Sequence, residues 1–124
     1  MGTWGYGIYE DDMAEDTKED YLRQLKLGKS DEDALHDFLE SYAKDLEDEE
    51  DSAVIYLALA DTMWKKGRLT QEIKDKAFEA MVRDLELGRW ESEKDIRNRT
   101  KVLDKLKEKL NSPMPARKKI PVHK

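Results

Sequence analysis

The chain has 124 residues, no cysteine and a formal net charge of −6, and 42% of its residues are charged. This length predicts one domain with a single modest core, and the lack of cysteine excludes disulfides and cysteine–metal sites. The N-terminus has no basic region followed by an apolar run, which a secretory signal would need. We therefore expect a cytoplasmic protein that does not enter a membrane.

Charge is distributed unevenly along the chain. Residues 1–63 hold 19 acidic and 5 basic side chains, a balance of −14, whereas residues 64–124 hold 10 acidic and 18 basic side chains, a balance of +8. A split of this kind can hold the two halves together or recruit charged partners. Ordinary solvated helix faces would produce it as well.

The first ten residues, MGTWGYGIYE, differ in composition from the rest of the chain. Three glycines within six positions oppose a helix, and no second strand candidate exists to pair with the segment. We predict an irregular segment whose Trp4 and Ile8 dock on the helices. A phosphate-binding loop is the functional alternative, but the glycine order G-x-x-G-x-G does not match the known phosphate-loop patterns.

Two amphipathic helices are predicted next, over residues 12–27 and 31–46. Asp11 or Asp12 can cap the first, and Gly28 is a suitable stop. Ser30 opens a sequence that resembles a capping box before the second helix. The acidic run EDEED at residues 47–51 then serves as a linker and cap, and it lacks the glycine that a calcium-binding loop requires.

Residues 53–64, AVIYLALADTMW, form the one long apolar run of the chain. Apolar side chains fall on all faces of the implied helix, so it must be buried on most sides. It is too short to span a bilayer, which needs roughly twenty residues. We interpret it as the central helix of the domain, ending at Gly67.

Two further helices are predicted over residues 71–87 and 91–110, with Trp90 between them. The last helix has a narrow apolar seam formed by Ile96, Leu103, Leu106 and Leu110. Its spacing is that of a coiled coil, but Arg99 interrupts it and it covers only about two heptads. We expect the seam to pack within its own chain, giving a monomer or a weak, salt-sensitive dimer.

The predicted fold is therefore all-α, a single five-helix, bundle-like domain over residues 1–112. The Gly/aromatic segment 1–10 packs on it, and residues 113–124 form a flexible basic tail. The predicted structural core is Trp4, Phe38, Leu57, Asp61, Trp64, Phe78, Met81 and Trp90.

Asp61 is the one polar residue of the central helix that could carry chemistry. A buried carboxylate must be paired or hydrogen-bonded, so we expect a structural role, with an N-terminal backbone amide, the Trp4 indole or Arg68 as its partner. An active-site acid or base with a raised pKa is the alternative. His36 lies near Asp33, Asp37 and Glu40 at helical spacing, and we interpret this group as a histidine on an acidic surface. No catalytic residues, metal ligands or cofactor motif are predicted.

The opening MGTWGYGIYEDDMAED resembles the start of a family of small bacterial proteins of unknown function, which open with Met-Gly-x-Trp-Gly-x-Gly-x-Phe-x-Asn/Asp-Asp. Trp4, Gly5, Gly7, Tyr9 and Asp12 stand at those positions, with Tyr9 in place of Phe. The stretch LALADTMWKKGRL and the segment LKEKLNSPMPARKKI are also similar to that family. The resemblance implies a shared fold and a bacterial origin, but no mechanism.

We predict a non-enzymatic protein-interaction role in the bacterial cytoplasm. The acidic N-terminal half fits a basic protein partner, as an immunity or inhibitor protein would have. An orphan hydrolase or metal-dependent enzyme that uses Asp61 is the first alternative. A nucleic-acid-associated protein, binding through the last helix and the basic tail, is the second, although a pI of about 5.0 opposes it.

Overall fold

The computed structural model describes residues 7–9, 11–86, 90 and 92–119. These residues form five α-helices and a short 3-10 turn and contain no strand, which confirms the all-α prediction. The elements are α1 (Asp12–Lys26), α2 (Asp31–Ser41), η1 (Asp45–Glu47), α3 (Glu49–Lys65), α4 (Gln71–Glu86) and α5 (Glu93–Asn111). Within this part of the chain, no helix combines the length and the apolar composition needed to cross a membrane.

Side-chain caps determine where several helices begin. Asp11 accepts a hydrogen bond from the Met13 amide at the start of α1, and Ser30 and Ser92 cap α2 and α5 in the same way. These contacts satisfy amide groups that have no partner inside the helix. Asp48 caps α3, so α3 begins within the acidic run rather than after it.

The predicted second helix is wrong in its C-terminal part. We expected it to reach residue 46, but α2 ends at Ser41, and the chain turns before it re-forms as η1. Leu46, in the middle of η1, still packs against the core. The apolar side chains of residues 31–46 therefore keep helical spacing, although this segment consists of α2, a turn and η1 rather than one helix.

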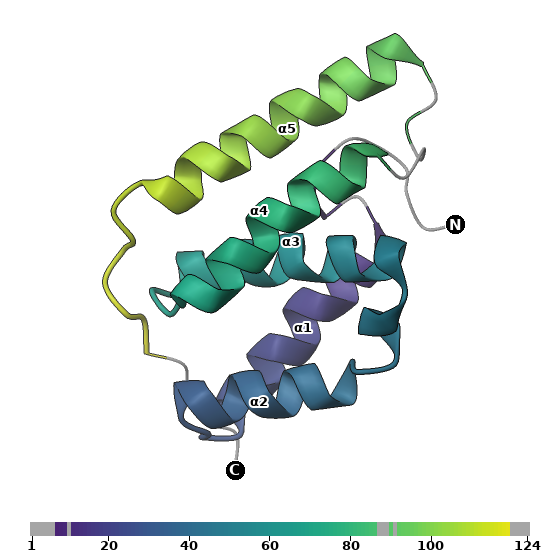
Figure 1. Cartoon of the computed structure of the whole chain (residues 1–124). Coiled ribbons are helices and arrows are strands. Elements are labelled where there is room, and N and C mark those ends of the chain that lie inside the picture. The colour runs from purple at the N-terminus through teal and green to yellow at the C-terminus, as the bar shows by residue number, and fades with distance from the viewer. Residues whose placement is uncertain (1–6, 10, 87–89, 91, 120–124) are drawn as a thin grey trace.

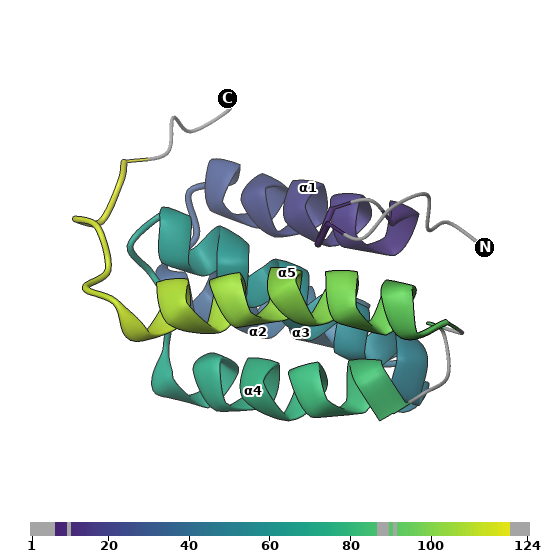
Figure 2. The same cartoon turned by 90° about the horizontal axis from the view of Figure 1, so that it is seen from above.

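Helix α3 is central, as predicted. It contacts α1, η1, α4 and α5, and in the view of Figure 2, α1 and α4 lie on opposite sides while α5 lies between them, over α3. Helix α2 packs against α1 at the far side of the molecule from α5 (Figure 1). The buried α3 residues run almost without interruption from Ser52 to Met63.

The predicted core residues fall into three groups. Phe38 and Leu57 are fully buried, and Met81, Trp90 and Asp61 are also buried. Trp64 and Phe78 are half-buried and pack against the core cluster. Trp4 lies outside the described residues.

The apolar seam of α5 faces its own chain. Leu103, Leu106 and Leu110 are buried, and α5 contacts α3 and α4, while Ile96 is 39% exposed. Position 99, which we interpreted as an interruption of the seam, is also buried.

Arg99 joins α5 to α4 through a buried ion pair. Its Nε and Nη2 atoms lie 2.9 and 3.1 Å from the two carboxylate oxygens of Asp84, which is fully buried. The Trp90 indole also donates to Asp84, at 3.1 Å, and the Arg99 guanidinium lies over the Trp90 ring. Arg99 further donates to the Gly7 carbonyl, so this cluster also reaches the N-terminal segment.

Residues 112–119 run from the end of α5 back toward α2 (Figure 1). Arg117 binds both carboxylate oxygens of Asp31 at 3.0 Å, and Arg68 pairs with the same carboxylate. The Lys118 amide donates to the Lys66 carbonyl at 2.9 Å. We predicted a flexible basic tail over residues 113–124, and that prediction did not include these contacts.

Gly67 allows this segment to approach the turn between α3 and α4. Its φ angle is +72°, and a Cβ atom added there would lie 2.6 Å from the Pro115 carbonyl oxygen. Glycine is therefore required at this position both for the left-handed backbone and for the close approach.

Replacing Leu57 with alanine tests the central position of α3. Because Leu57 is fully buried, Leu57→Ala is expected to lower the free energy of unfolding by about 2–5 kcal/mol. Val82→Ala on the exposed side of α4 is the control, with an expected change within about 0.5 kcal/mol. Urea denaturation measures both, and equal effects would contradict the described packing.

The Asp84–Arg99 pair can be tested in the same way. Arg99→Met removes the guanidinium partner of a fully buried carboxylate, which is expected to cost about 3–5 kcal/mol of unfolding free energy. Arg97→Met removes the same charge from an exposed position of α5 and should have little effect. If both variants unfold at the same urea concentration, the ion pair contributes nothing to stability.

Candidate functional site

The candidate site is centred on Asp61, in the fourth turn of α3. The helix is apolar on all faces, so the position of this residue inside the fold follows from the sequence. Asp61 is only 2% exposed. A carboxylate in such an environment requires donors close to both of its oxygens.

Three side chains from different parts of the chain supply these donors. The Tyr9 hydroxyl lies 2.7 Å from Asp61 Oδ2, and Lys65 Nζ lies 3.0 Å from the same oxygen. Lys109 Nζ, from the last turn of α5, lies 2.8 Å from Asp61 Oδ1. The Tyr9 hydroxyl also lies within hydrogen-bond distance of the Ala58 carbonyl and the Thr62 hydroxyl.

The surroundings of Asp61 keep it ionised. Burial alone would raise the pKa of Asp61, but the hydrogen bonds from Lys109, Tyr9 and Lys65 outweigh burial and hold that pKa below its ordinary value of 3.8. Burial and the neighbouring Asp61 charge raise the pKa of Tyr9, so the phenol remains a donor.

The predicted structural role of Asp61 fits this geometry, but the predicted partners differ from those that the structure describes. Arg68 pairs with Asp31 instead, and Trp4 lies outside the described residues. The alternative, an active-site acid or base with a raised pKa, does not fit, because the pKa of Asp61 is lowered. A carboxylate held ionised by two ammonium groups is a poor proton donor near neutral pH.

A pocket of about 340 Å³ opens beside this group, between α3, α5 and the N-terminal segment. Its walls combine apolar side chains with the Tyr9 phenol, the Asp61 carboxylate and lysine ammonium groups. The volume is in the lower part of the range for small-molecule pockets. The site therefore has the size and the mixed lining that a small ligand needs.

The group around His36 lies elsewhere, on α2. Ligand atoms of His36, Asp37 and Glu40 lie within 4.8 Å of one another, and Asp33 is not part of the group. His36 and Glu40 are exposed, and Asp37 pairs with Lys29 at 2.7 Å. These contacts fit the predicted histidine on an acidic surface.

Sequence reasoning missed all three donors of the site, Tyr9, Lys65 and Lys109. Tyr9 belongs to a segment in which we expected Trp4 and Ile8 to pack. Lys109 resembles the other lysines of α5, but it precedes the buried Leu110 and lies three residues after the buried Leu106. This position beside the apolar seam is the signal that could have indicated a lysine directed toward the core.

Comparisons with protein-family models, with curated proteins and with solved structures found no match to this chain. The resemblance of its opening residues to a bacterial family therefore stays a prediction.

Asp61→Asn tests whether the site holds an ionised carboxylate. Because the folded-state pKa of Asp61 is lowered, its contribution to stability is present above the unfolded-state pKa and is lost as the pH falls through the folded-state pKa. We expect the unfolding free energy of the wild type to fall more steeply with acidification than that of Asp61→Asn. The difference between the two slopes should correspond to the uptake of at most about one proton on unfolding. Chemical denaturation between about pH 7 and about pH 3 measures this difference.

Asp104→Asn, which removes an exposed carboxylate of α5, is the matched control and should retain the wild-type slope. A wild-type slope in Asp61→Asn would show that Asp61 is not held ionised by Tyr9, Lys65 and Lys109.

Proposed function

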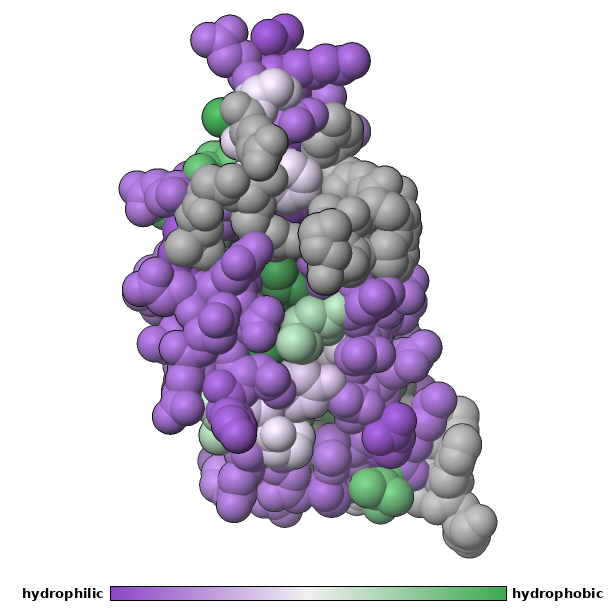
Figure 3. All heavy atoms as spheres, turned by 90° about the vertical axis from the view of Figure 1, so that its right-hand side faces the viewer, coloured by the Kyte–Doolittle hydropathy of each residue, from purple (hydrophilic) through white to green (hydrophobic). Residues whose placement is uncertain are grey.

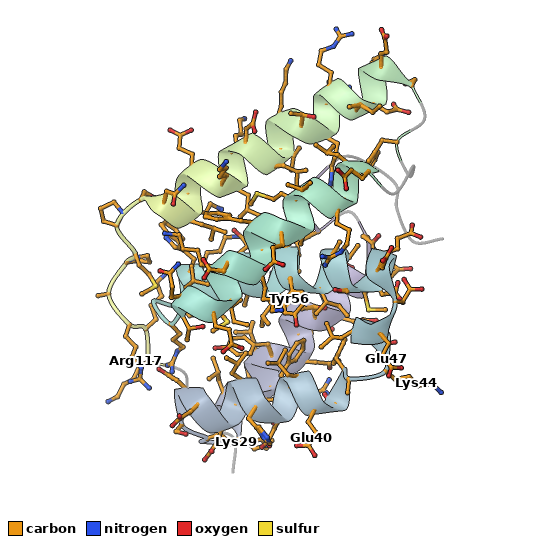
Figure 4. All side chains as sticks on the ribbon, in the orientation of Figure 1. Lys29, Glu40, Lys44, Glu47, Tyr56 and Arg117 are labelled. Atoms are coloured by element: carbon orange, nitrogen blue, oxygen red, sulfur yellow. The ribbon has the colours of Figure 1, made fainter. Side chains whose placement is uncertain are left out.

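We propose that this chain is a non-enzymatic protein-interaction module whose acidic face binds a basic protein, in the manner of an immunity or inhibitor protein. The acidic face consists of the carboxylates at the starts of α1 and α3 and along η1: Asp11, Asp45, Glu47, Asp48, Glu49, Glu50 and Asp51. Hydrophilic side chains cover most of this end of the molecule (Figure 3). Glu47 lies at the opposite end from Arg117 (Figure 4).

The observation that carries the proposal is the crowding of negative charge around Asp51. Burial raises the pKa of Asp51, and the nearby charges of Asp48, Asp45, Glu50 and Asp11 raise it further. The ionised face therefore costs free energy in the isolated chain. A basic partner would relieve this repulsion and would be attracted over a long range at low salt.

Two exposed carboxylates of this face, those of Glu47 and Glu49, are available for a partner. Glu47 and Glu49 are exposed and form no ion pair within the described part of the chain. Lys44 lies beside Glu47 (Figure 4), and Arg83 donates to the Glu49 carbonyl and to the Ser52 hydroxyl, so the seven carboxylates of this face still outnumber the cations beside them. A partner with several lysine or arginine residues fits this surface by charge complementarity.

The two alternative functions have less support. An enzyme that uses Asp61 as an acid needs a raised pKa, whereas the pKa of Asp61 is lowered. Nucleic-acid binding needs free cations, whereas Arg99, Lys109 and Arg117 are paired with carboxylates. Charge on α5 that seemed available in the sequence is therefore partly neutralised inside the fold.

The bacterial cytoplasm and the monomeric state are part of the same proposal. A chain without cysteine is compatible with a reducing compartment. The α5 seam packs against α3 and α4, which supports a monomer or a weak dimer held by exposed charges that salt would screen.

Affinity capture from a bacterial lysate tests the acidic face. The wild-type chain is expected to retain a protein with a high pI at low salt and to release it at high salt, because the attraction between exposed charges is screened. Combined replacement of the exposed pair, Glu47→Gln and Glu49→Gln, should weaken this capture several-fold.

The control carries Glu79→Gln and Glu108→Gln, which remove the same charge from exposed positions of α4 and α5, and it should capture like the wild type. The proposal fails if the control loses capture as strongly, or if nucleic acid replaces the basic protein in the captured material.

A further inference from the structure

The pocket beside Asp61 is separate from the acidic face and has the opposite charge. Its apolar surface comes from Ile8 on the N-terminal segment and from Val102 and Leu106 on α5. These side chains line the same pocket, and we call them together its apolar wall. An aliphatic or aromatic group of a ligand would lose water-exposed surface by binding against it.

Three lysines surround this wall: Lys65, Lys105 and Lys109. Asp61 supplies one negative charge, so the side chains of the pocket carry an excess of two positive charges. Lys65 and Lys109 each place one ammonium contact on Asp61. Since an ammonium group has three donors, both lysines retain hydrogen-bonding capacity beyond the carboxylate.

Lys105 differs from the other two lysines. It lines the pocket, is exposed, and forms no ion pair with a carboxylate of the described residues. Lys18, on α1 and outside the lining of the pocket, places its ammonium group 5.3 Å from the centre of the Tyr9 ring. The pocket thus contains cationic groups whose charge is not balanced by the one carboxylate in it.

From this combination we infer that the pocket binds a small organic acid, a monocarboxylate with an aliphatic body of medium length. The apolar group lies against Ile8, Val102 and Leu106, and the carboxylate pairs with Lys105 and with the remaining donors of Lys65. Neither the apolar group nor the carboxylate of such a ligand is sufficient for binding alone. The apolar wall is small, and a lone exposed ion pair contributes little to affinity.

Octanoate is a suitable probe because it has both halves of the inferred ligand. Titration of the full chain with octanoate, below its micelle concentration and followed by two-dimensional NMR, should give saturable shifts at Ile8, Val102 and Leu106. Octanol has the same apolar group without charge, and acetate has the same charge without the apolar group. Both should bind more weakly than octanoate.

Lys105→Gln tests the cationic part of the pocket. Because Lys105 is exposed, the variant should fold like the wild type, and its dissociation constant for octanoate should rise by about fivefold. Lys107→Gln is the matched control: it removes the same charge from an exposed position of α5 outside the pocket, and it should bind octanoate with wild-type affinity.

Three results would overturn the inference. The first is the absence of saturable shifts at the pocket residues with octanoate. The second is octanol or acetate binding as tightly as octanoate. The third is an equal loss of affinity in Lys105→Gln and Lys107→Gln, which would indicate non-specific attraction to the basic helix. None of these results depends on the acidic face or on its protein partner.

Discussion

One ionised carboxylate, that of Asp61, lies on a helix that is buried on almost every side. Its need for donors constrains where the segment at residues 7–9 and helix α5 lie. An unpaired charge in such a place would cost several kcal/mol. The donors that offset this cost are Lys65 on α3 itself, Tyr9 from the N-terminal segment and Lys109 from the last turn of α5. The segment at residues 7–9 and helix α5 are therefore both attached to the same buried carboxylate.

The uneven charge of the two halves has two consequences in the fold. Some acids of the first half pair with cations of the second: Asp61 binds Lys109, and Asp31 binds Arg68 and Arg117. Other acids collect at the opposite end, where Asp51 and its neighbours repel one another. The charge split therefore holds the two halves together at Asp61 and Asp31, whereas recruitment of a charged partner by the remaining acids stays a prediction.

Local signals in the sequence predicted most helix limits, because caps and glycines act within one turn of the residues they affect. The predicted C-terminal end of α2 was wrong because Leu46 has the helical spacing of the α2 stripe, although it lies in η1, after the chain has turned. Lys65 lies four residues after Asp61, at helical spacing, but Tyr9 and Lys109 were not predictable in the same way. Helical spacing shows which side chains face inward but not which distant side chain they meet. Arg99 could have been interpreted better: its seam position and the inward position of Asp84 together indicate a buried pair.

Helix α5 attaches to the body through only three buried leucines, Leu103, Leu106 and Leu110. Apolar contacts are not directional, so this seam alone would allow the helix to rotate or slide. Ion pairs with defined geometry lie at both ends of the seam, Arg99 with Asp84 and Lys109 with Asp61, and they select one register. Because α5 also forms one wall of the pocket, the register that these pairs select determines the shape of the proposed ligand site.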